Sequence, residues 1–243
     1  MSNLDQSKSS CRITRGPLQH DSIVPKTLEF IRTQLPQWRD DPKRPVSESE
    51  KSLNSTLCDF LEFRRREILP MARFKHESPQ HGNRTVDIGV HGTAEETVIG
   101  ASTYSLYDPF LVIECKRLPS PGGRDREQEY ANGYTNTGSP TGGIQRFKLG
   151  LHGKNVETAV IVGYIQMNDP KHWRKTINNW IRDLSKSTQK DSLHWCEDEQ
   201  LSKSKSDKPV GMYSLRSKHP RLSVGITLPI EVLHYWIVMS CDE

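Results

Sequence analysis

The sequence predicts an α/β protein whose central sheet is flanked by helices. Residues 110–116 and 158–165 are apolar runs of strand length, and residues 84–90 alternate between apolar and polar side chains. Residues 170–185 instead repeat their large apolar side chains every three or four positions, which is the period of a helix. Because such strands and helices alternate along the chain, we expect both in one packed domain.

Length and composition bound the domain organisation. A chain of 243 residues fits one domain, but a hydrophobic content of 33% and a mean hydropathy of −0.71 are polar for a globular protein. Long loops or disordered ends would explain that polarity. We therefore expect residues 1–22 to be disordered and residues 23–243 to form a single domain, with long loops at 119–143 and 187–209.

The net charge, the absence of long apolar runs and the cysteine spacing indicate which partners and which compartment to expect. A net charge of +4 and an isoelectric point of about 8.7 are compatible with a nucleic-acid partner. No apolar run approaches the roughly 20 residues of a membrane span, and the first residues are too polar for a signal peptide. The five cysteines are scattered without any C-x-x-C pair, so we expect a reduced, cytoplasmic protein without a zinc knuckle.

Two helices are predicted before the first strand. Residues 25–38 carry apolar side chains at helical spacing, and a second helix runs from Ser47 to about Ile68. Ser47 and Glu50 have the spacing of a capping box. Three consecutive arginines, Arg64, Arg65 and Arg66, come near the end of the second helix. They fit either a solvated helix end, favoured by the helix dipole, or contacts to phosphate.

The remaining elements follow from the same patterns. Predicted strands cover residues 71–77, 84–90, 109–117 and 158–165, with a short strand at 97–99 and closing strands at 210–216 and 222–238, where residues 230–237 also fit a helix. A helix begins at Gly142-Gly143-Ile144 and ends near Gly150 or Gly153. Because this helix joins residues 110–117 to residues 158–165, those two strands should be parallel.

The strand at 110–116 ends in Glu114-Cys115-Lys116. Side chains alternate between the two faces of a strand, so Glu114 and Lys116 share one face and Cys115 points to the other, as a core residue. Charged side chains at the end of an apolar strand are costly to bury without a ligand. The pair is either a solvated strand end or part of a site that holds a metal ion and a phosphate.

A second carboxylate favours the site. In residues 84–90, Val86, Ile88 and Val90 alternate with Asp87 and Gly89, so Asp87 lies opposite the valines. If this strand pairs with residues 110–116, Asp87, Glu114 and Lys116 converge. Two carboxylates that hold Mg²⁺, with a lysine beside the attacking water, can cleave a phosphodiester bond.

These residues resemble the PD-(D/E)xK nuclease superfamily, which has the restriction-endonuclease-like fold. Asp87 matches its first acid and Glu114-Cys115-Lys116 its E-x-K, whereas Val86 stands where the superfamily's proline would precede the acid. The resemblance covers residues 47–166. It implies a mixed central sheet and a metal site at Asp87 and Glu114 for Mg²⁺ or Mn²⁺, with Lys116 acting on the attacking water.

The resemblance also implies further site residues. An acid from the N-terminal helix often lies near the metal in this superfamily, and Glu50 fits that position, although it also fits a simple capping role. Many members carry Gln or a basic residue on the helix after E-x-K, and Gln145 and Arg146 match it, with Lys148 as a weaker candidate for phosphate. The glycines before this helix leave its N-terminus open to a phosphate. An ordinary helix start would look the same.

The sequence therefore predicts a metal-dependent nuclease. We expect Asp87, Glu114, Lys116 and Glu50 at the catalytic centre, and Gln145, Arg146, Arg64 and Arg65 on the substrate, with DNA favoured over RNA. Restriction or antiviral defence is the setting that the resemblance implies, with recombination and repair as alternatives. The chain carries no recognisable DNA-reading domain, so a homodimer or a partner subunit would supply targeting. The alternatives are a non-catalytic nucleic-acid-binding or scaffold subunit of the same fold, and a metal-free domain in which Glu114 and Lys116 form a surface pair.

Overall fold

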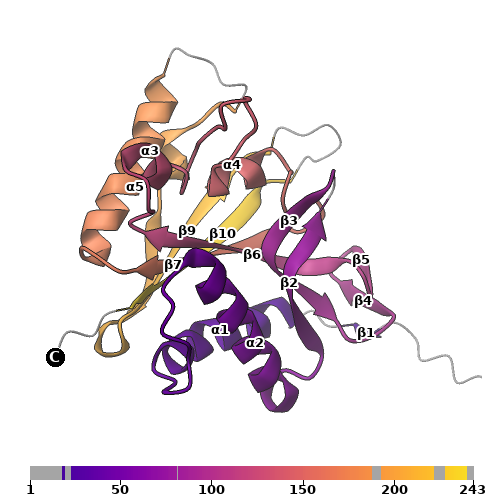
Figure 1. Cartoon of the computed structure of the whole chain (residues 1–243). Coiled ribbons are helices and arrows are strands. Elements are labelled where there is room, and N and C mark those ends of the chain that lie inside the picture. The colour runs from indigo at the N-terminus through magenta and orange to yellow at the C-terminus, as the bar shows by residue number, and fades with distance from the viewer. Residues whose placement is uncertain (1–17, 20–22, 81, 188–192, 222–227, 240–243) are drawn as a thin grey trace, which may run out of the picture.

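The protein is built around one seven-stranded mixed sheet with helices on both faces (Figure 1). The computed structural model describes residues 18–19, 23–80, 82–187, 193–221 and 228–239. Its sheet has the order β2-β3-β6-β7-β10-β9-β8, and a smaller sheet has the order β1-β4-β5. The α/β class is confirmed, as is a mixed sheet flanked by helices.

The strands follow the sequence patterns closely. Those of the large sheet are β2 (Ala72–Gln80), β3 (Arg84–Gly92), β6 (Pro109–Leu118), β7 (Thr158–Ile165), β8 (Ser202–Asp207), β9 (Met212–His219) and β10 (Ile230–Val238). Those of the small sheet are β1 (Leu18–Gln19), β4 (Glu96–Ile99) and β5 (Ser102–Ser105). Strands β6 and β7 run parallel, as predicted, and β10 runs parallel to β7 on its other side.

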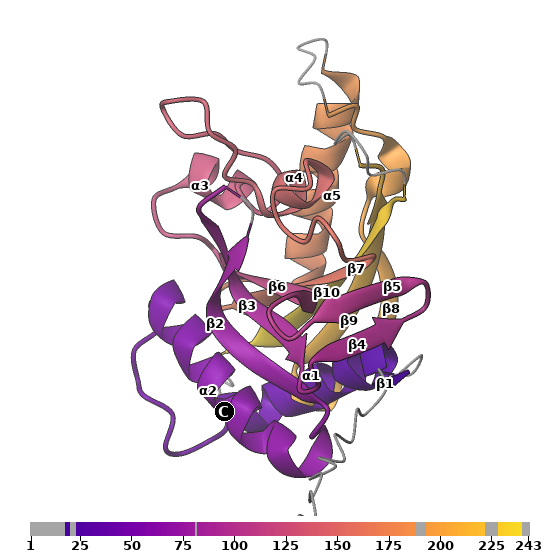
Figure 2. The same cartoon turned by 90° about the vertical axis from the view of Figure 1, so that its right-hand side faces the viewer.

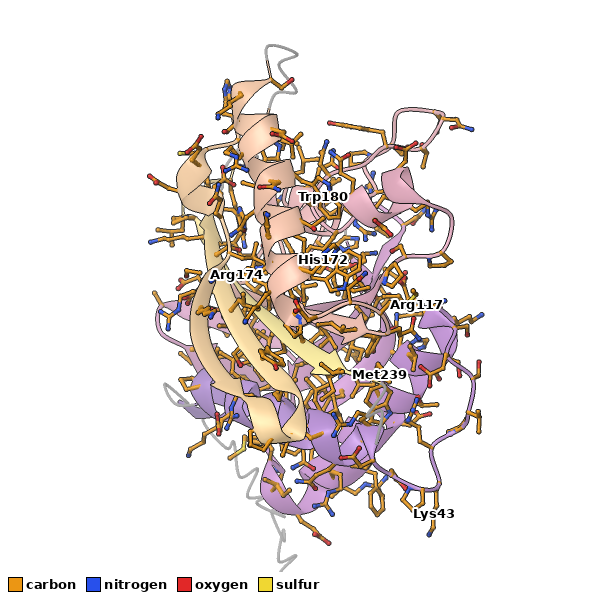
Figure 3. The ribbon with its side chains drawn as sticks, turned by 90° about the vertical axis from the view of Figure 1, so that its left-hand side faces the viewer. Lys43, Arg117, His172, Arg174, Trp180 and Met239 are labelled. Atoms are coloured by element: carbon orange, nitrogen blue, oxygen red, sulfur yellow. The ribbon has the colours of Figure 1, made fainter. Side chains whose placement is uncertain are left out.

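Two layers of helices cover the large sheet (Figure 2). Helices α1 (Ile23–Arg39) and α2 (Glu50–Ile68) cover one face, and α4 (Gly143–Lys148) and α5 (Pro170–Lys186) cover the other. Figure 3 views the molecule from the α5 side, with His172, Arg174 and Trp180 on that helix. Trp173 and Trp180 are buried, as expected for core residues rather than exposed stacking platforms.

Cys115 shows how the alternation of β6 separates the two layers. Its side chain is fully buried, as predicted, and lies against Tyr164 of β7, whose ring packs 5.6 Å from that of Trp38 on α1. Glu114 and Lys116 project to the opposite face, where a Cβ added to Gly143 of α4 would lie 3.7 Å from Lys116 Cε. The polar residues of the E-x-K motif thus belong to the α4 face.

Some predicted boundaries are wrong. Ser49, not Ser47, is the N-cap of α2: its side chain accepts a hydrogen bond from Ser52 N at 3.3 Å, which makes Glu50 the first helical residue and removes the predicted capping box. The ambiguous segment at 230–237 is a strand, and β5 was missed. The prediction of disorder at 1–22 lies outside the described residues, except for Leu18 and Gln19, which pair with β4.

The two predicted loops contain more structure than expected. Residues 119–143, expected as a long loop, include helix α3 (Arg124–Gln128), and Tyr130 and Ala131 lie fully buried, so this segment contributes to the core. Residues 187–209 include β8 and two short 3₁₀ turns, Glu197–Glu199 and Lys208–Val210. In the part of the chain that the structure describes, no helix is long and apolar enough to cross a membrane.

Candidate active site

Strands β3 and β6 separate at Asp87. Their ladder ends at the pair Ile88 and Ile113, so the next pair, Asp87 and Glu114, stands where the strands diverge. On the other side of β3 the ladder with β2 skips Glu77, which has a left-handed φ of 47° opposite Asp87. Breaks in pairing bend a strand and redirect its side chains. The fork between β3 and β6 therefore opens at the residue that the sequence marked as the first acid.

The Asp87 side chain accepts a hydrogen bond from the β6 backbone at the point where the β3 backbone no longer pairs with β6. Beyond the fork, β6 has backbone N–H groups that no neighbouring strand accepts, and buried donors of this kind need a partner. The carboxylate of Asp87 accepts from Cys115 N at 2.7 Å through its Oδ2. One oxygen of Asp87 thus fixes its side chain against β6, and Oδ1 has no hydrogen-bond partner among the described residues.

Glu50 performs the same task one step further along β6. Its Oε2 accepts from Arg117 N at 3.3 Å, and because α2 begins at Glu50, this contact brings the helix N-terminus to the edge of β6. Residues 115 and 117 are about 6.6 Å apart along a strand. The sequence placed Glu50 near the first acid, and the structure brings Glu50, Asp87 and Glu114 within electrostatic range of one another.

Glu114 is fully buried and has a positively charged neighbour on one oxygen and a histidine on the other. Arg146 Nη2 donates to Glu114 Oε2 at 2.8 Å, and His152 Nδ1 is hydrogen-bonded to Oε1. Burial alone would raise the pKa of Glu114, but Arg146 and His152 outweigh it and hold that pKa at about 2. Glu114 is therefore a carboxylate throughout the physiological range.

Asp87 behaves in the opposite way. Burial and then the charge of Glu114 raise its pKa to about 7, with a smaller contribution from Glu50, while Lys116 and the Cys115 N–H act against the shift. Burial is the larger cause of this raised pKa, and the carboxylate charges of Glu114 and Glu50 add to it. A cation placed there would remove the repulsion, so the shifted pKa is one observation in favour of a cation site.

Lys116 lies between the fork and helix α4. Its side chain is 9% exposed, and in the described residues its Nζ makes no hydrogen bond or ion pair. The neighbouring Gly143 keeps this space open, since a side chain there would contact Lys116 Cε and approach Tyr130 O to 3.1 Å. Lys116 thus carries an uncommitted ammonium group beside two carboxylates, which is the arrangement that the E-x-K motif predicts.

Comparison of the chain with models of protein families, with curated proteins and with solved structures found no match. What this chain does is therefore inferred from the chemistry of these residues.

The donors at the fork suit a hard divalent cation. Mg²⁺ prefers carboxylate oxygens and keeps several waters, and Asp87 offers a carboxylate oxygen that makes no other bond. Each oxygen of Glu114 already accepts one hydrogen bond, from Arg146 or from His152, and keeps a second lone pair through which Glu114 could join Asp87. Within the described residues no three His, Cys, Asp or Glu side chains gather as a ready-made metal cluster.

Helix α4 does not offer its N-terminus to a phosphate. Gly143 N, Ile144 N and Gln145 N donate to the carbonyls of residues 129, 130 and 131, at 2.8, 3.3 and 2.9 Å. Gln145 is fully buried, and its Oε1 accepts from Gly133 N and Gly142 N at 3.1 and 3.0 Å. The expected phosphate site at this helix start is therefore filled by the protein's own loop, and Gln145 holds that loop.

The arginines of α2 lie away from the fork. Arg64 donates to Gln34 and Gln37 of α1, and Arg65 pairs with Glu62 at 2.5 Å. Arg64 is 14 residues beyond Glu50, which corresponds to about 21 Å along a helix. That Arg64 and Arg65 bind substrate stays a prediction, and this placement would put such contacts well away from the fork.

Sequence reasoning missed His152. It lies four residues after α4 in a glycine-rich turn, is 1% exposed, and packs edge-on against Phe147 at 6.5 Å between ring centroids. A lone histidine in such a turn carries no pattern that separates a site residue from a surface one. Only its contact with Glu114, 38 positions earlier in the chain, reveals it.

Proposed function

We propose that this protein is a metal-dependent nuclease of the restriction-endonuclease-like fold, which hydrolyses phosphodiester bonds and most readily those of DNA. The observation that carries the proposal is the meeting of Asp87 and Glu114 at the β3–β6 fork, with the uncommitted Lys116 two residues beyond Glu114. The mildly basic charge of the chain is compatible with a nucleic-acid substrate. Restriction or antiviral defence is the setting that we favour.

Each residue has a role that its position allows. Asp87 and Glu114 would hold Mg²⁺ or Mn²⁺, and Glu50 would hold a water at the edge of that shell. Such a metal supplies Lewis acidity to a phosphoryl oxygen and acidifies a bound water. Lys116 orients that water and stabilises negative charge on the phosphoryl oxygens. Arg146 forms an ion pair with Glu114 in this structure. It would turn from Glu114 to a phosphate of the bound substrate.

The test is cleavage of defined substrates. The full chain is incubated with supercoiled plasmid, linear duplex, single-stranded DNA and RNA, each with Mg²⁺, Mn²⁺ or EDTA. We expect metal-dependent cleavage of DNA that Asp87→Asn abolishes. The control Asp59→Asn removes an exposed carboxylate from α2 and should cut like the unchanged protein. Cleavage that persists in EDTA would overturn the proposal.

A second candidate is a non-catalytic nucleic-acid-binding or scaffold subunit of the same architecture. The favouring observation is that the carboxylates already have structural partners: Asp87 and Glu50 accept from the β6 backbone, and Glu114 accepts from Arg146 and His152. A thermal-shift titration separates the two. A ligand that binds only the folded state raises apparent stability. A metal-dependent rise that Asp87→Asn removes favours the nuclease, and no rise at any metal concentration favours the scaffold.

A further inference from the structure

A buried chain of hydrogen-bonded side chains crosses the α4 face of the sheet. Its members, in order of contact, are Trp236, Tyr130, His234, Ser217, His219, Glu199 and Lys148. The contacts measure 2.9, 2.8, 2.7, 2.7, 2.6 and 2.6 Å in the same order. None of the seven side chains belongs to the fork, and all lie in the interior. We call this set the buried polar chain.

The hydrogen bonds of the buried polar chain agree with a single assignment of donors and acceptors. Glu199 accepts from Lys148, from Cys196 N at 2.9 Å and from His219 Nδ1, so His219 Nε2 is left as an acceptor. Ser217 then donates to His219 Nε2 and accepts from His234 Nε2, each at 2.7 Å.

The same counting completes the other half of the buried polar chain. His234 Nδ1 must accept, so Tyr130 donates its hydroxyl to it and accepts from Trp236 Nε1. Burial lowers the pKa of both His219 and His234, which keeps the rings neutral, as this order requires. Every link is therefore satisfied, and such networks fix the groups that they join.

The two ends of the buried polar chain lie near residues of the candidate site without touching them. Lys148 is the last residue of α4, two positions after Arg146, and is fully buried on Glu199 and over the Trp195 ring at 4.6 Å. At the other end, Trp236 lies over Gly163, where a Cβ would come within 2.4 Å of its Cδ1. Gly163 is the β7 partner of Lys116.

Tyr130 ties the start of α4 to the same chain. The carbonyl of Tyr130 accepts from Ile144 N, and its neighbours in the loop accept from Gly143 N and Gln145 N. Helix α4 has only six residues, too few to hold its own position. It is therefore fastened at its N-terminus through Tyr130 and at its C-terminus through Lys148.

The contacts of Glu199, His219 and Ser217 also have the order of a hydrolase triad. Ser217 is 5% exposed, and both of its hydrogen-bonding directions are taken by histidines. A nucleophile needs a free approach to a substrate atom. Glu199, His219 and Ser217 therefore have a structural role and not a catalytic one.

We propose that the buried polar chain is a positioning device: it fixes α4 at both ends and thereby sets where Arg146 meets Glu114 and where Lys116 lies beside Gly143. Its effect on rate rests on the proposed nuclease function, whereas its effect on α4 can be measured without it. The residues of the buried polar chain are positioning residues, because none touches the atoms of the fork.

The test breaks the buried polar chain at its centre with Ser217→Ala in the full protein. Ser217→Ala removes two buried hydrogen bonds, to His219 and to His234, and should speed hydrogen exchange of the backbone amides of residues 143–149 by at least about ten-fold. It should lower kcat for DNA cleavage by about the same factor while KM stays within about two-fold, because chemistry is more sensitive to placement than binding is. Ser217→Thr keeps the hydroxyl and should restore both values.

A second variant gives an independent break in the buried polar chain, and a control variant checks that the effect is specific. Tyr130→Phe breaks the buried polar chain near its other end and should reproduce the α4 effect, which decides the matter if Ser217→Ala does not fold. Tyr235→Phe makes the same chemical change on the opposite face of β10 and should leave exchange in α4 and kcat unchanged.

Two outcomes would overturn the inference. One is wild-type exchange in α4 together with wild-type kcat in Tyr130→Phe. The other is exchange that rises equally in α5, β9 and β10, which would mean a general decrease in stability rather than a displacement of α4. If the unchanged protein cuts no nucleic acid, the proposed function fails, but the exchange data still decide whether the buried polar chain positions α4.

Discussion

The fork and the buried polar chain use the same kinds of residue in opposite ways. At the fork, Glu114 is paired with Arg146 and His152. Asp87 and Glu50, however, take single backbone hydrogen bonds, Lys116 makes no ion pair in the described residues, and the charges of Glu114 and Glu50 repel that of Asp87. In the buried polar chain, Lys148 and Glu199 form a bidentate pair with 2.6 Å contacts, fully shielded from water.

That difference teaches how to separate a site from a structural network by the way its charged side chains are paired. Charged residues that satisfy one another hold a fold together, and removing either one leaves a buried charge without its partner. Charged residues that share one sign, or that lack a partner, raise the energy of the fold and signal a missing ligand. The following predictions test that contrast, in order of expected effect.

Replacing the two lysines should affect different properties. Lys116→Ala should lower the cleavage rate by about 10²–10³-fold, since it removes a positioned transition-state donor, and should leave the melting temperature nearly unchanged. Rates are measured at saturating DNA and metal. The matched control is Lys175→Ala, an exposed lysine of α5. Cutting at the unchanged rate would show that Lys116 is not catalytic.

Lys148→Met should do the reverse. It leaves Glu199 as a buried charge without its cation, which typically costs about 3–5 kcal/mol of folding free energy. The double variant Lys148→Met with Glu199→Gln removes both charges and should recover much of that stability. Urea unfolding of the two variants measures the difference. A double variant that is no more stable than Lys148→Met would show that packing, and not the pair, matters at this position.

The pH dependence of stability should report the repulsion at Asp87. Its pKa is raised from 3.8 to about 7, so its favourable contribution is complete below pH 3.8 and is lost as the pH rises through about 7. Asp87→Asn removes that loss. The variant should therefore be more stable than the unchanged protein at pH 8 and approach it at pH 5, measured by urea unfolding without divalent metal. A gap that is the same at both pH values would contradict the shifted pKa.

The salt dependence of DNA binding should distinguish the arginines. On duplex DNA, removing one ionic interaction with a phosphate flattens the log–log slope of affinity against salt by about 0.9. Arg146→Gln should show such a change, because Arg146 lies at the fork. Arg65→Gln should show none, because Arg65 pairs with Glu62 on the far part of α2. The same slope for both variants would place the DNA elsewhere.

The sequence predicted what is local. Strand β7 matches residues 158–165, and α5 extends residues 170–185 by one residue, because apolar periodicity directly reflects which side chains face the core. The pairing of β3 with β6 was also expected, since Asp87 and Glu114 gain a common purpose only if these strands are neighbours.

The contacts that sequence reasoning missed join residues that are far apart along the chain. Arg146 looked free for substrate because its partner Glu114 lies 32 positions away, and Tyr130 looked like a loop residue because its partner His234 lies 104 positions away. The error at Ser47 was smaller: serines at 47 and 49 both fit a cap, and only the backbone angles and the bond from Ser52 N select Ser49. Periodicity shows which face a side chain occupies, but it does not show what it meets there.

Gly163 lies between the buried polar chain and the strand that carries Lys116. A single methyl group at this position would strike the Trp236 indole on one side, while the neighbouring strand position holds Lys116 on the other. A mutation there would not be a small change in a core strand, since it would displace Trp236, one end of the buried polar chain, at the strand position that pairs with Lys116. We therefore expect stability alone to preserve this glycine, so that a descendant that has lost the activity should still carry it.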